Sequence, residues 1–225
     1  VDGKGVVRLR SLVANAVAGA NCPVPRTYFT HYYKRFLQFM NEPAITSNDI
    51  VMLGNSLTEG GGDWGKRLGK DNVINRGISG DVAMGIYDRL HQILPGKPKK
   101  IFLLIGVNDI SHDLSTDSIV QMIEKNVTRI QRESPETKLY LQSLLPIDES
   151  FNRYKKLTNK TYQIPEINDR LKALAKEKKI DFIDLYPLFT EKGTNVLRKE
   201  LTYDGLHLKE EGYKIWVDAI KKKMK

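Results

Sequence analysis

The sequence predicts a three-layer α/β/α sandwich built around a five-stranded parallel sheet. From residue 49 onward, short apolar segments alternate with amphipathic helical patterns, which is typical of parallel strands joined by helical crossovers. The predicted strands are residues 50–53, 73–75, 100–105, 138–145 and 180–185. Rules for such connections favour the strand order 2-1-3-4-5, a flavodoxin-like arrangement.

Apolar residues at helical spacing predict the helices that cover this sheet. One repeat follows Asp81, which we expect to be an N-cap, and a second follows Ser115. The apolar positions of these two repeats are Val82, Ile86, Leu90 and Ile93, and Ile119, Ile123, Val127 and Ile130. Three further helices are predicted at 32–40, 167–174 and 213–220.

The length of 225 residues fits one globular domain. We expect residues 1–48 to form a leader and a helix that packs on the domain, and residues 49–225 to form the domain itself. Cys22 is the single cysteine, so no disulfide within the chain is expected. No Cys/His cluster has the spacing of a structural zinc site, and no metal is expected.

The formal net charge of +9 raises the question of an anionic macromolecular partner. The basic residues are scattered and lack interleaved aromatic side chains, which argues against nucleic-acid binding. No apolar segment approaches the roughly 20 residues of a membrane span. Residues 6–20 faintly resemble an export signal, so a periplasmic or extracellular location is slightly favoured. The oligomeric state is open.

Polar or small residues follow each of the first three predicted strands. Ser56 lies just beyond the first strand, Gly80 beyond the second and Asn108 beyond the third. The carboxyl ends of parallel strands share one edge of the sheet, and ligands bind there. We therefore expect these three residues to lie close together.

A serine at this edge becomes a useful nucleophile when a base accepts its proton. His207 lies beyond the fifth predicted strand, and Asp204 precedes it by three residues in a short loop. That carboxylate can accept the Nδ1 proton and leave Nε2 facing Ser56. His112, which follows the third strand, is the rival base.

Acyl transfer also requires hydrogen-bond donors for the negative charge that develops on the carbonyl oxygen. The backbone N–H groups of Ser56 and Gly80 and the side-chain amide of Asn108 are suitable donors. Gly80 has no Cβ to block the approach of a substrate. Each residue alone has a commoner explanation as a helix cap or a turn. These structural explanations do not account for their joint placement.

These residues, in this order and spacing, resemble the four sequence blocks of the SGNH (GDSL) hydrolase superfamily, over residues 50–213. Segments 75–81, 144–146 and 207–213 are similar to the platelet-activating-factor acetylhydrolase and sialate O-acetylesterase branch. The resemblance implies a nucleophile, a base and a supporting acid at Ser56, His207 and Asp204. It also implies oxyanion donors at Ser56, Gly80 and Asn108, and no cofactor. Asn55 stands where the family usually has an aspartate.

The expected function is hydrolysis of a small-molecule acyl ester, with an O-acetyl group on a carbohydrate as the substrate that the resemblance favours. Lysophospholipids and thioesters are alternatives in the same class. A non-catalytic carbohydrate- or partner-binding module and a flavin-binding module are alternatives from other classes. Additional substrate contacts are expected from Asn55, Trp64, Asp109, His112 and Tyr203. For Trp64 and Tyr203, core packing or a lid role explains the sequence equally well.

Overall fold

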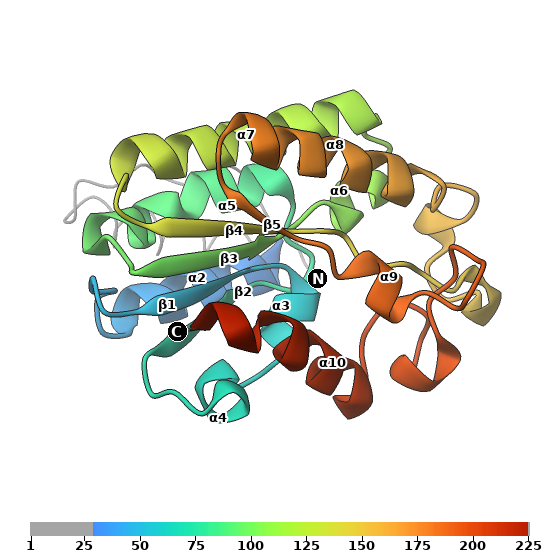
Figure 1. Cartoon of the computed structure of the whole chain (residues 1–225), viewed down its shortest axis with the longest axis horizontal. Helices are drawn as coiled ribbons and strands as arrows, with labels where there is room; N and C mark the ends of the chain where they lie inside the picture. The colour runs from blue at the N-terminus through green and yellow to red at the C-terminus, as the bar shows by residue number, and fades with distance from the viewer. Residues whose placement is uncertain (1–28, 225) are drawn as a thin grey trace.

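The computed structural model describes residues 29–224, and its centre is an all-parallel sheet with helices on both faces (Figure 1). The strands are β1 (Ile50–Gly54), β2 (Val73–Gly77), β3 (Lys100–Leu104), β4 (Lys138–Gln142) and β5 (Asp181–Ile183). Their order is β2-β1-β3-β4-β5, so the predicted order and the predicted layers are confirmed. The export-like stretch at residues 6–20 and the rest of the predicted leader before residue 29 lie outside the described residues.

The central strands are apolar throughout because helices cover both of their faces. In β1, Val51 and Leu53 pack on one face, whereas Ile50 and Met52 pack on the other. Gly54 at the end of β1 is level with Gly77 of β2 and with Leu104 of β3. The loops that follow these three strands therefore leave the sheet at one edge.

Each face of the sheet has its own set of helices. The first face carries α5 (Ala83–Arg89), α6 (Val107–Ser111), α7 (Thr116–Glu133) and α8 (Gln163–Glu177). The second face carries α3 (Ser56–Gly60), α4 (Trp64–Leu68), α9 (Tyr186–Phe189) and α10 (Glu210–Lys221). The short 3-10 helices are η1 (Leu90–Gln92), η2 (Leu94–Gly96), η3 (Glu149–Phe151), η4 (Lys155–Leu157), η5 (Lys199–Leu201) and η6 (Lys222–Met224).

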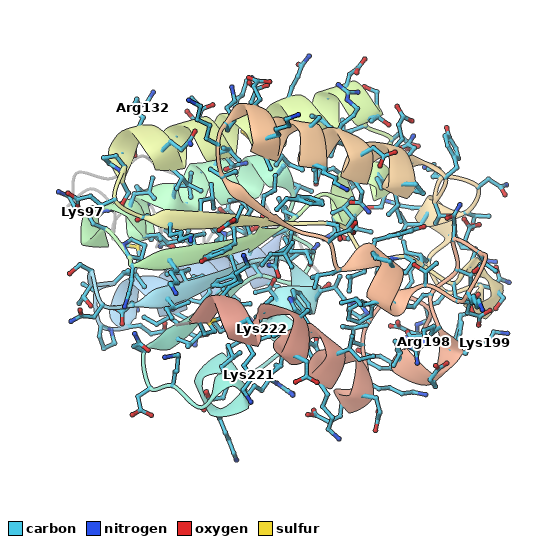
Figure 2. All side chains as sticks on the ribbon, in the orientation of Figure 1. Lys97, Arg132, Arg198, Lys199, Lys221 and Lys222 are labelled. Carbon is cyan, nitrogen blue, oxygen red and sulfur yellow. The ribbon has the colours of Figure 1, made fainter. Side chains whose placement is uncertain are left out.

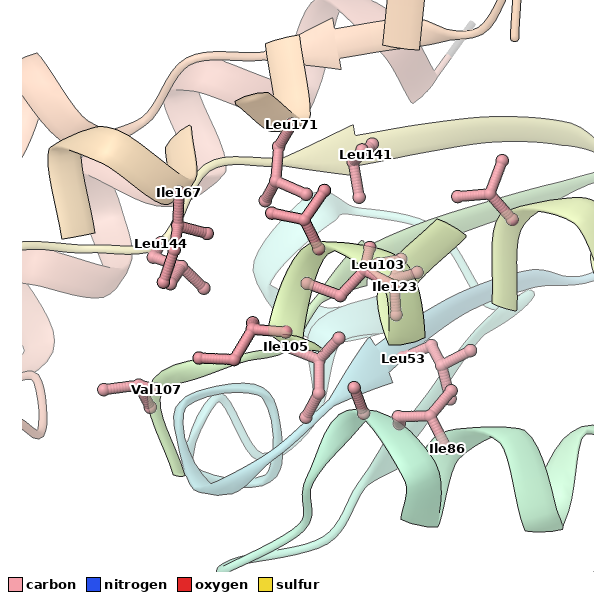
Figure 3. Close-up of a cluster of buried hydrophobic side chains, with 14 of the residues drawn as sticks. Leu53, Ile86, Leu103, Ile105, Val107, Ile123, Leu141, Leu144, Ile167 and Leu171 are labelled. Atoms are coloured by element: carbon pink, nitrogen blue, oxygen red, sulfur yellow. The ribbon is translucent and has the colours of Figure 1, made fainter. Parts of the chain in front are cut away.

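The core of the first face is continuous from the sheet to its helices. Figure 3 shows Leu53 of β1 close to Ile86 of α5, and Leu103 of β3 close to Ile123 of α7. Leu171 of α8 lies near Leu141 of β4 in the same view. All six side chains are almost fully buried. This packing fixes the strand ends, and with them the loops that carry polar groups.

Helix α2 (Thr30–Asn41) buries an aromatic face beside the sheet. Tyr32, Tyr33, Phe36 and Phe39 pack together with Ile78, which follows β2. The hydroxyl of Tyr32 donates a hydrogen bond to the carbonyl of Gly85 in α5, over 3.0 Å. Helix α2 is thereby held against the loop after β2, the loop that also contains Gly80.

The two predicted helix starts have different outcomes. Ser115 caps α7 and accepts a hydrogen bond from the Ser118 N–H, as the pattern predicts. The prediction that Asp81 caps the next helix is wrong. The N-cap of α5 is Val82. The carboxylate of Asp81 instead forms a buried ion pair with Arg89, two turns further along.

Basic side chains are distributed over the surface instead of gathering on one face. Figure 2 labels Lys97, Arg132, Arg198, Lys199, Lys221 and Lys222, which lie in four separate parts of the molecule. Within residues 29–224, no helix has the length and apolar character needed to cross a bilayer.

Candidate active site

Ser56 is the first residue of α3, directly after the end of β1. The side chain of Asn55 caps this helix and accepts a hydrogen bond from the Leu57 N–H at 3.1 Å. Gly54 makes the turn possible, because a Cβ there would lie 2.4 Å from the carbonyl oxygen of Leu104. The hydroxyl of Ser56 is thus fixed at the edge where β1 and β3 end.

His207 and Asp204 meet Ser56 at this edge. The Nε2 atom of His207 lies 2.9 Å from Ser56 Oγ, and its Nδ1 atom lies 2.8 Å from Asp204 Oδ2. The other carboxylate oxygen of Asp204 accepts hydrogen bonds from the backbone N–H groups of Leu206 and His207. The structure therefore brings together the serine, histidine and aspartate that the sequence singles out.

The loop that carries Asp204 and His207 is held by its own hydrogen bonds. Thr202 Oγ1 donates to the carbonyl of His207 at 2.7 Å and accepts from the Gly205 N–H at 2.9 Å. Gly205 has φ of +88°, a conformation that favours glycine. Its carbonyl accepts from the Asp148 N–H at 2.9 Å, which ties the loop to the segment after β4.

The carboxylate of Asp204 is stabilised in its charged form. Burial alone would raise its pKa, but hydrogen bonds from Tyr154, from the His207 side chain and from two backbone N–H groups outweigh burial. The net result is a pKa below the ordinary value of an aspartate. An ionised Asp204 can accept the Nδ1 proton of His207 and leave Nε2 free to accept a proton from Ser56.

The predicted oxyanion donors also lie at this edge. Ser56, Gly80 and Asn108 all line the cavity described below. Within the described chain, the N–H groups of Ser56 and Gly80 donate no hydrogen bond and remain free for a ligand. Gly80 has φ of +82°. The amide of Asn108 donates to the carbonyl of Asp81 at 2.8 Å, which orients this side chain.

Glu59, which sequence reasoning missed, connects α3 to the Gly80 loop. Its carboxylate accepts a hydrogen bond from the Ser79 N–H, and it is ion-paired with Arg35 and bonded to His31. Burial would raise the pKa of Glu59, but the hydrogen bonds from Ser79 and His31 lower it. Glu59 follows Ser56 by one helical turn, so it links the nucleophile to the loop that carries the Gly80 donor.

The residues that follow the donors Gly80 and Asn108, Asp81 and Asp109, both have buried carboxyl groups. Asp81 pairs with Arg89 at 2.9 Å, and Arg89 also donates to the carbonyl of Gly54 at 3.1 Å. Burial raises the pKa of Asp81 to about 6, although Arg89 opposes this rise. Burial likewise raises the pKa of Asp109 to about 7, against hydrogen bonds from backbone N–H groups, including that of Ala83.

A cavity of about 900 Å³ opens above these groups. It is lined by Ser56, Glu59, Gly60, Ser79, Gly80, Asn108, Ser111, Arg153, Tyr154, Lys155, Lys156, Leu157, Tyr203, Leu206, His207, Leu208 and Tyr213. Its volume is within the range of small-molecule sites. Tyr203 is one of the expected substrate contacts, and its ring stacks on the His207 ring with centroids 6.0 Å apart.

Four other expected substrate contacts are not on the cavity wall. Trp64 is fully buried, and its Nε1 donates to the carbonyl of Thr58. Asn55 and Asp109 are also buried, one capping α3 and the other bonded to the Ala83 N–H. His112 is exposed at the end of α6 and does not line the cavity. Substrate contact by these four residues stays a prediction, because their positions do not place them at the cavity.

Tyr154 is a second residue that sequence reasoning missed. Its hydroxyl donates to Asp204 Oδ2 at 2.6 Å and lies 2.9 Å from His207 Nδ1. Burial, followed by the hydrogen bond to Asp204, raises its pKa. In the sequence, Tyr154 is an aromatic residue within the basic segment 153–156. This pattern does not indicate a partner 50 residues away. Within residues 29–224, no group of three His, Cys, Asp or Glu side chains is arranged to hold a metal ion.

A model of the GDSL-like lipase/acylhydrolase family matches residues 52–215. The chain belongs to this family. The predicted membership of the SGNH/GDSL hydrolase superfamily is therefore confirmed. The matched range includes Ser56 and His207. It also includes the last three residues of β1 and all of β2, β3, β4 and β5.

Solved structures of related acylhydrolases share the fold. A Streptococcus pneumonia protein assigned provisionally as a platelet activating factor has a TM-score of 0.78 and 24% identity, with 100% of both chains covered. A GDSL-like lipase from Bacteroides thetaiotaomicron has a TM-score of 0.75 and 24% identity, covering 86% of this chain and 96% of that one. The acetyl xylan esterase AlAXEase has a TM-score of 0.65 and 22% identity, covering 79% and 100%.

One related protein is named for an activity other than ester hydrolysis. The N-acylneuraminate cytidylyltransferase of Escherichia coli O18:K1:H7 (strain RS218 / NMEC) is 26% identical over 177 residues, or 77% of this chain. The chain spans 39% of the length of that relative.

Proposed function

We propose that this acylhydrolase removes small acyl groups, above all acetyl groups, from the hydroxyl groups of carbohydrates, and that it forms an acyl-enzyme on Ser56. The observation that carries the proposal is the chain of contacts from Ser56 Oγ to His207 Nε2, at 2.9 Å, and from His207 Nδ1 to Asp204, at 2.8 Å. A serine hydroxyl bonded to a histidine that a carboxylate orients is the arrangement required for nucleophilic acyl transfer.

In the first step, Ser56 Oγ attacks the carbonyl carbon of the ester, and its proton passes to His207 Nε2. The negative charge on the carbonyl oxygen is stabilised by the N–H groups of Ser56 and Gly80 and by the amide of Asn108. The tetrahedral intermediate then expels the alcohol, which takes the proton from His207. An acyl group remains on Ser56.

In the second step, a water molecule gives a proton to His207 and attacks the acyl-enzyme. Collapse of the second intermediate releases the carboxylic acid and returns the proton to Ser56. The balance is one ester and one water converted to one acid and one alcohol. Asp204 stays ionised throughout and stabilises the imidazolium form of His207, which is consistent with its lowered pKa.

Two observations support a carbohydrate acetyl ester within the broader ester class. Two structural relatives are named as acetyl-sugar esterases, AlAXEase and the acetyl-xylooligosaccharide esterase Axe2 from Geobacillus. The cavity is open, and Tyr203 at its wall is 60% exposed. An exposed aromatic ring beside polar groups suits the apolar face of a sugar.

A substrate panel tests the proposal. The full chain is assayed with 4-nitrophenyl acetate and butyrate, acetylated xylo-oligosaccharides, a lysophospholipid and an acyl-thioester. We expect the highest kcat/KM for acetylated sugars and release of acetate. A preference for the lysophospholipid or the thioester would replace the carbohydrate assignment while leaving the acyl-enzyme intact. If none of these compounds is turned over, the proposal that the protein is an esterase is rejected.

A further inference from the structure

A buried ion pair connects the loops that carry the three proposed oxyanion donors. Arg89 of α5 and Asp81 are both almost fully buried, and Arg89 Nε lies 2.9 Å from Asp81 Oδ2. Within residues 29–224, the cavity lining includes neither of them, so neither contacts a substrate there. Any effect of this pair on the reaction must therefore pass through other residues.

Arg89 also reaches the strand that leads to the nucleophile. Its Nη2 atom donates to the carbonyl of Gly54 at 3.1 Å, and Gly54 precedes Ser56 by two residues. The planar guanidinium thus bonds Asp81 through Nε and Gly54 through Nη2 at the same time. A lysine ammonium lacks this rigid fork of donors. Arg89 therefore fixes the end of β1 relative to the loop after β2.

Asp81 is bonded to the loops of the other two donors. Its N–H donates to the carbonyl of Ile78 at 3.0 Å, which closes a turn in which Gly80 has φ of +82°. The carbonyl of Asp81 accepts from the Asn108 amide at 2.8 Å. One residue therefore sets both the turn that presents the Gly80 N–H and the orientation of the Asn108 amide.

Stability alone does not explain this pair. Replacement of a buried ion pair by apolar residues of similar volume is often neutral or stabilising, because desolvation opposes the attraction between the charges. Arg89 Nη1 is buried and has no hydrogen-bond partner among the described residues, which adds to the cost of burial. The geometry that the pair imposes on three loops is the better explanation for its presence.

We infer that Arg89 and Asp81 are positioning residues for acyl transfer, and that they hold the three proposed oxyanion donors in the geometry of the transition state. This inference rests on the proposed function and adds to it two residues outside the cavity. An oxyanion site acts through donors that are already in place where the negative charge develops. A displacement of about 1 Å can lower a rate by about 10²-fold, even when the altered residue is far from the chemistry. Such a displacement acts on the transition state more than on the bound substrate, so the effect should be on kcat.

Two variants test the pair with 4-nitrophenyl acetate as the substrate. Asp81→Asn/Arg89→Met removes both charges together, and the asparagine oxygen can still accept the Val82 N–H that now bonds Asp81. We expect this double variant to lose about 10²-fold in kcat, with KM nearly unchanged. Arg89→Lys keeps the charge but not the fork, and should show a smaller loss in the same parameter. Thermal unfolding followed by circular dichroism checks that each variant is folded.

The matched control is Arg129→Met/Glu133→Gln. Arg129 also pairs with a carboxylate, that of Glu133 at 3.1 Å, and it also donates to a carbonyl of α5, that of Tyr87 at 2.6 Å. In the described part of the chain, neither Arg129 nor Glu133 lines the active-site cavity. This control should keep the wild-type kcat and KM.

A double-mutant cycle with Asn108→Ala separates positioning from a structural role. If the pair acts through the donors, its removal should lower kcat/KM by a factor at least about fivefold smaller in the Asn108→Ala background than in wild type. The reason is that this background has already lost one of the groups that the pair orients. A purely structural role predicts equal losses in the two backgrounds.

Five results would overturn the inference: an unchanged kcat in both variants, a loss confined to KM, equal losses in the two backgrounds of the cycle, an equal loss in the control, or failure of both variants to fold. The last result would assign the pair to stability. In each case, turnover of 4-nitrophenyl acetate by wild type and labelling of its Ser56 by a fluorophosphonate would leave the proposed function standing. Absence of both in wild type would instead reject the proposed function itself.

Discussion

The hydroxyl of Tyr154 donates a 2.6 Å hydrogen bond to Asp204 Oδ2, the same oxygen that lies 2.8 Å from His207 Nδ1. The same carboxylate oxygen therefore contacts both the phenol of Tyr154 and the imidazole of His207. This contact joins the segment between β4 and α8 to the loop after η5. It also couples the cavity wall to the orientation of the proposed base.

Tyr154→Phe removes that hydrogen bond and keeps the ring. We expect kcat for 4-nitrophenyl acetate to fall by about tenfold, since a hydrogen bond to a charged group contributes about 1.5–3 kcal/mol. KM should change little, because the lost group orients the triad. Tyr186→Phe, which removes a hydroxyl outside the cavity, is the matched control. Equal kcat values for Tyr154→Phe and wild type would show that the phenol has no positioning role.

Asp204→Asn keeps the size of the side chain but places an amide opposite His207 Nδ1. The amide cannot stabilise the imidazolium, and it favours the wrong histidine tautomer, so we expect kcat to fall by up to about 10⁴. Asp184→Asn, on the loop after β5, is a charge-matched control that should retain activity. Full activity of the Asp204→Asn variant would remove Asp204 from the triad.

Asn108→Ala removes one of the three proposed oxyanion donors. An oxyanion donor acts mainly on charge that appears in the transition state, so the loss should be in kcat, by about 10²–10³, with KM nearly unchanged. Steady-state kinetics with a neutral acetyl ester measures both parameters. A raised KM with an unchanged kcat would place Asn108 in ground-state binding instead.

The buried carboxyl of Asp109 predicts a pH dependence of stability. Its pKa is raised by burial to about 7, whereas an aspartate in the unfolded chain titrates near 3.9. Between pH ~4 and pH ~7 the folded state binds more protons than the unfolded state, so the free energy of unfolding falls as pH rises. Asp109→Asn cannot ionise, and its urea midpoint should exceed that of wild type at pH 7.5 but be similar at pH 4.5. A wild-type advantage at pH 7.5 would contradict this account.

The fold follows from the sequence because apolar strands and helical repeats alternate along most of the chain. The positions of Ser56, Gly80 and Asn108 follow from the same pattern, since each lies in the loop or turn that follows a predicted strand. The proximity of His207 to Ser56 also follows, because both lie beyond carboxyl ends of strands. These positions can be predicted from the order of strands and helices alone, without knowledge of side-chain packing.

The residues that the sequence did not predict depend on packing between distant segments. Tyr154 reaches Asp204 because Gly205 allows the Asp148 segment to approach closely, a contact that no local pattern encodes. Trp64 could stack on a substrate or pack in the core, and the structure shows core packing: it contacts Trp216 and closely approaches Gly61, where a Cβ would lie 2.3 Å from the Trp64 ring. Asp81 was expected to cap a helix, but the buried Arg89 supplies a stronger partner.

Covalent labelling of Ser56 tests the central claim most directly. Wild-type protein and Ser56→Ala are treated with a fluorophosphonate, and intact mass followed by peptide mapping locates the adduct. The account predicts one adduct on Ser56 in wild type, none in Ser56→Ala, and a loss of kcat on the order of 10⁶ for that variant. Labelling of a different serine, or a Ser56→Ala variant that keeps more than about a tenth of wild-type turnover, would contradict it.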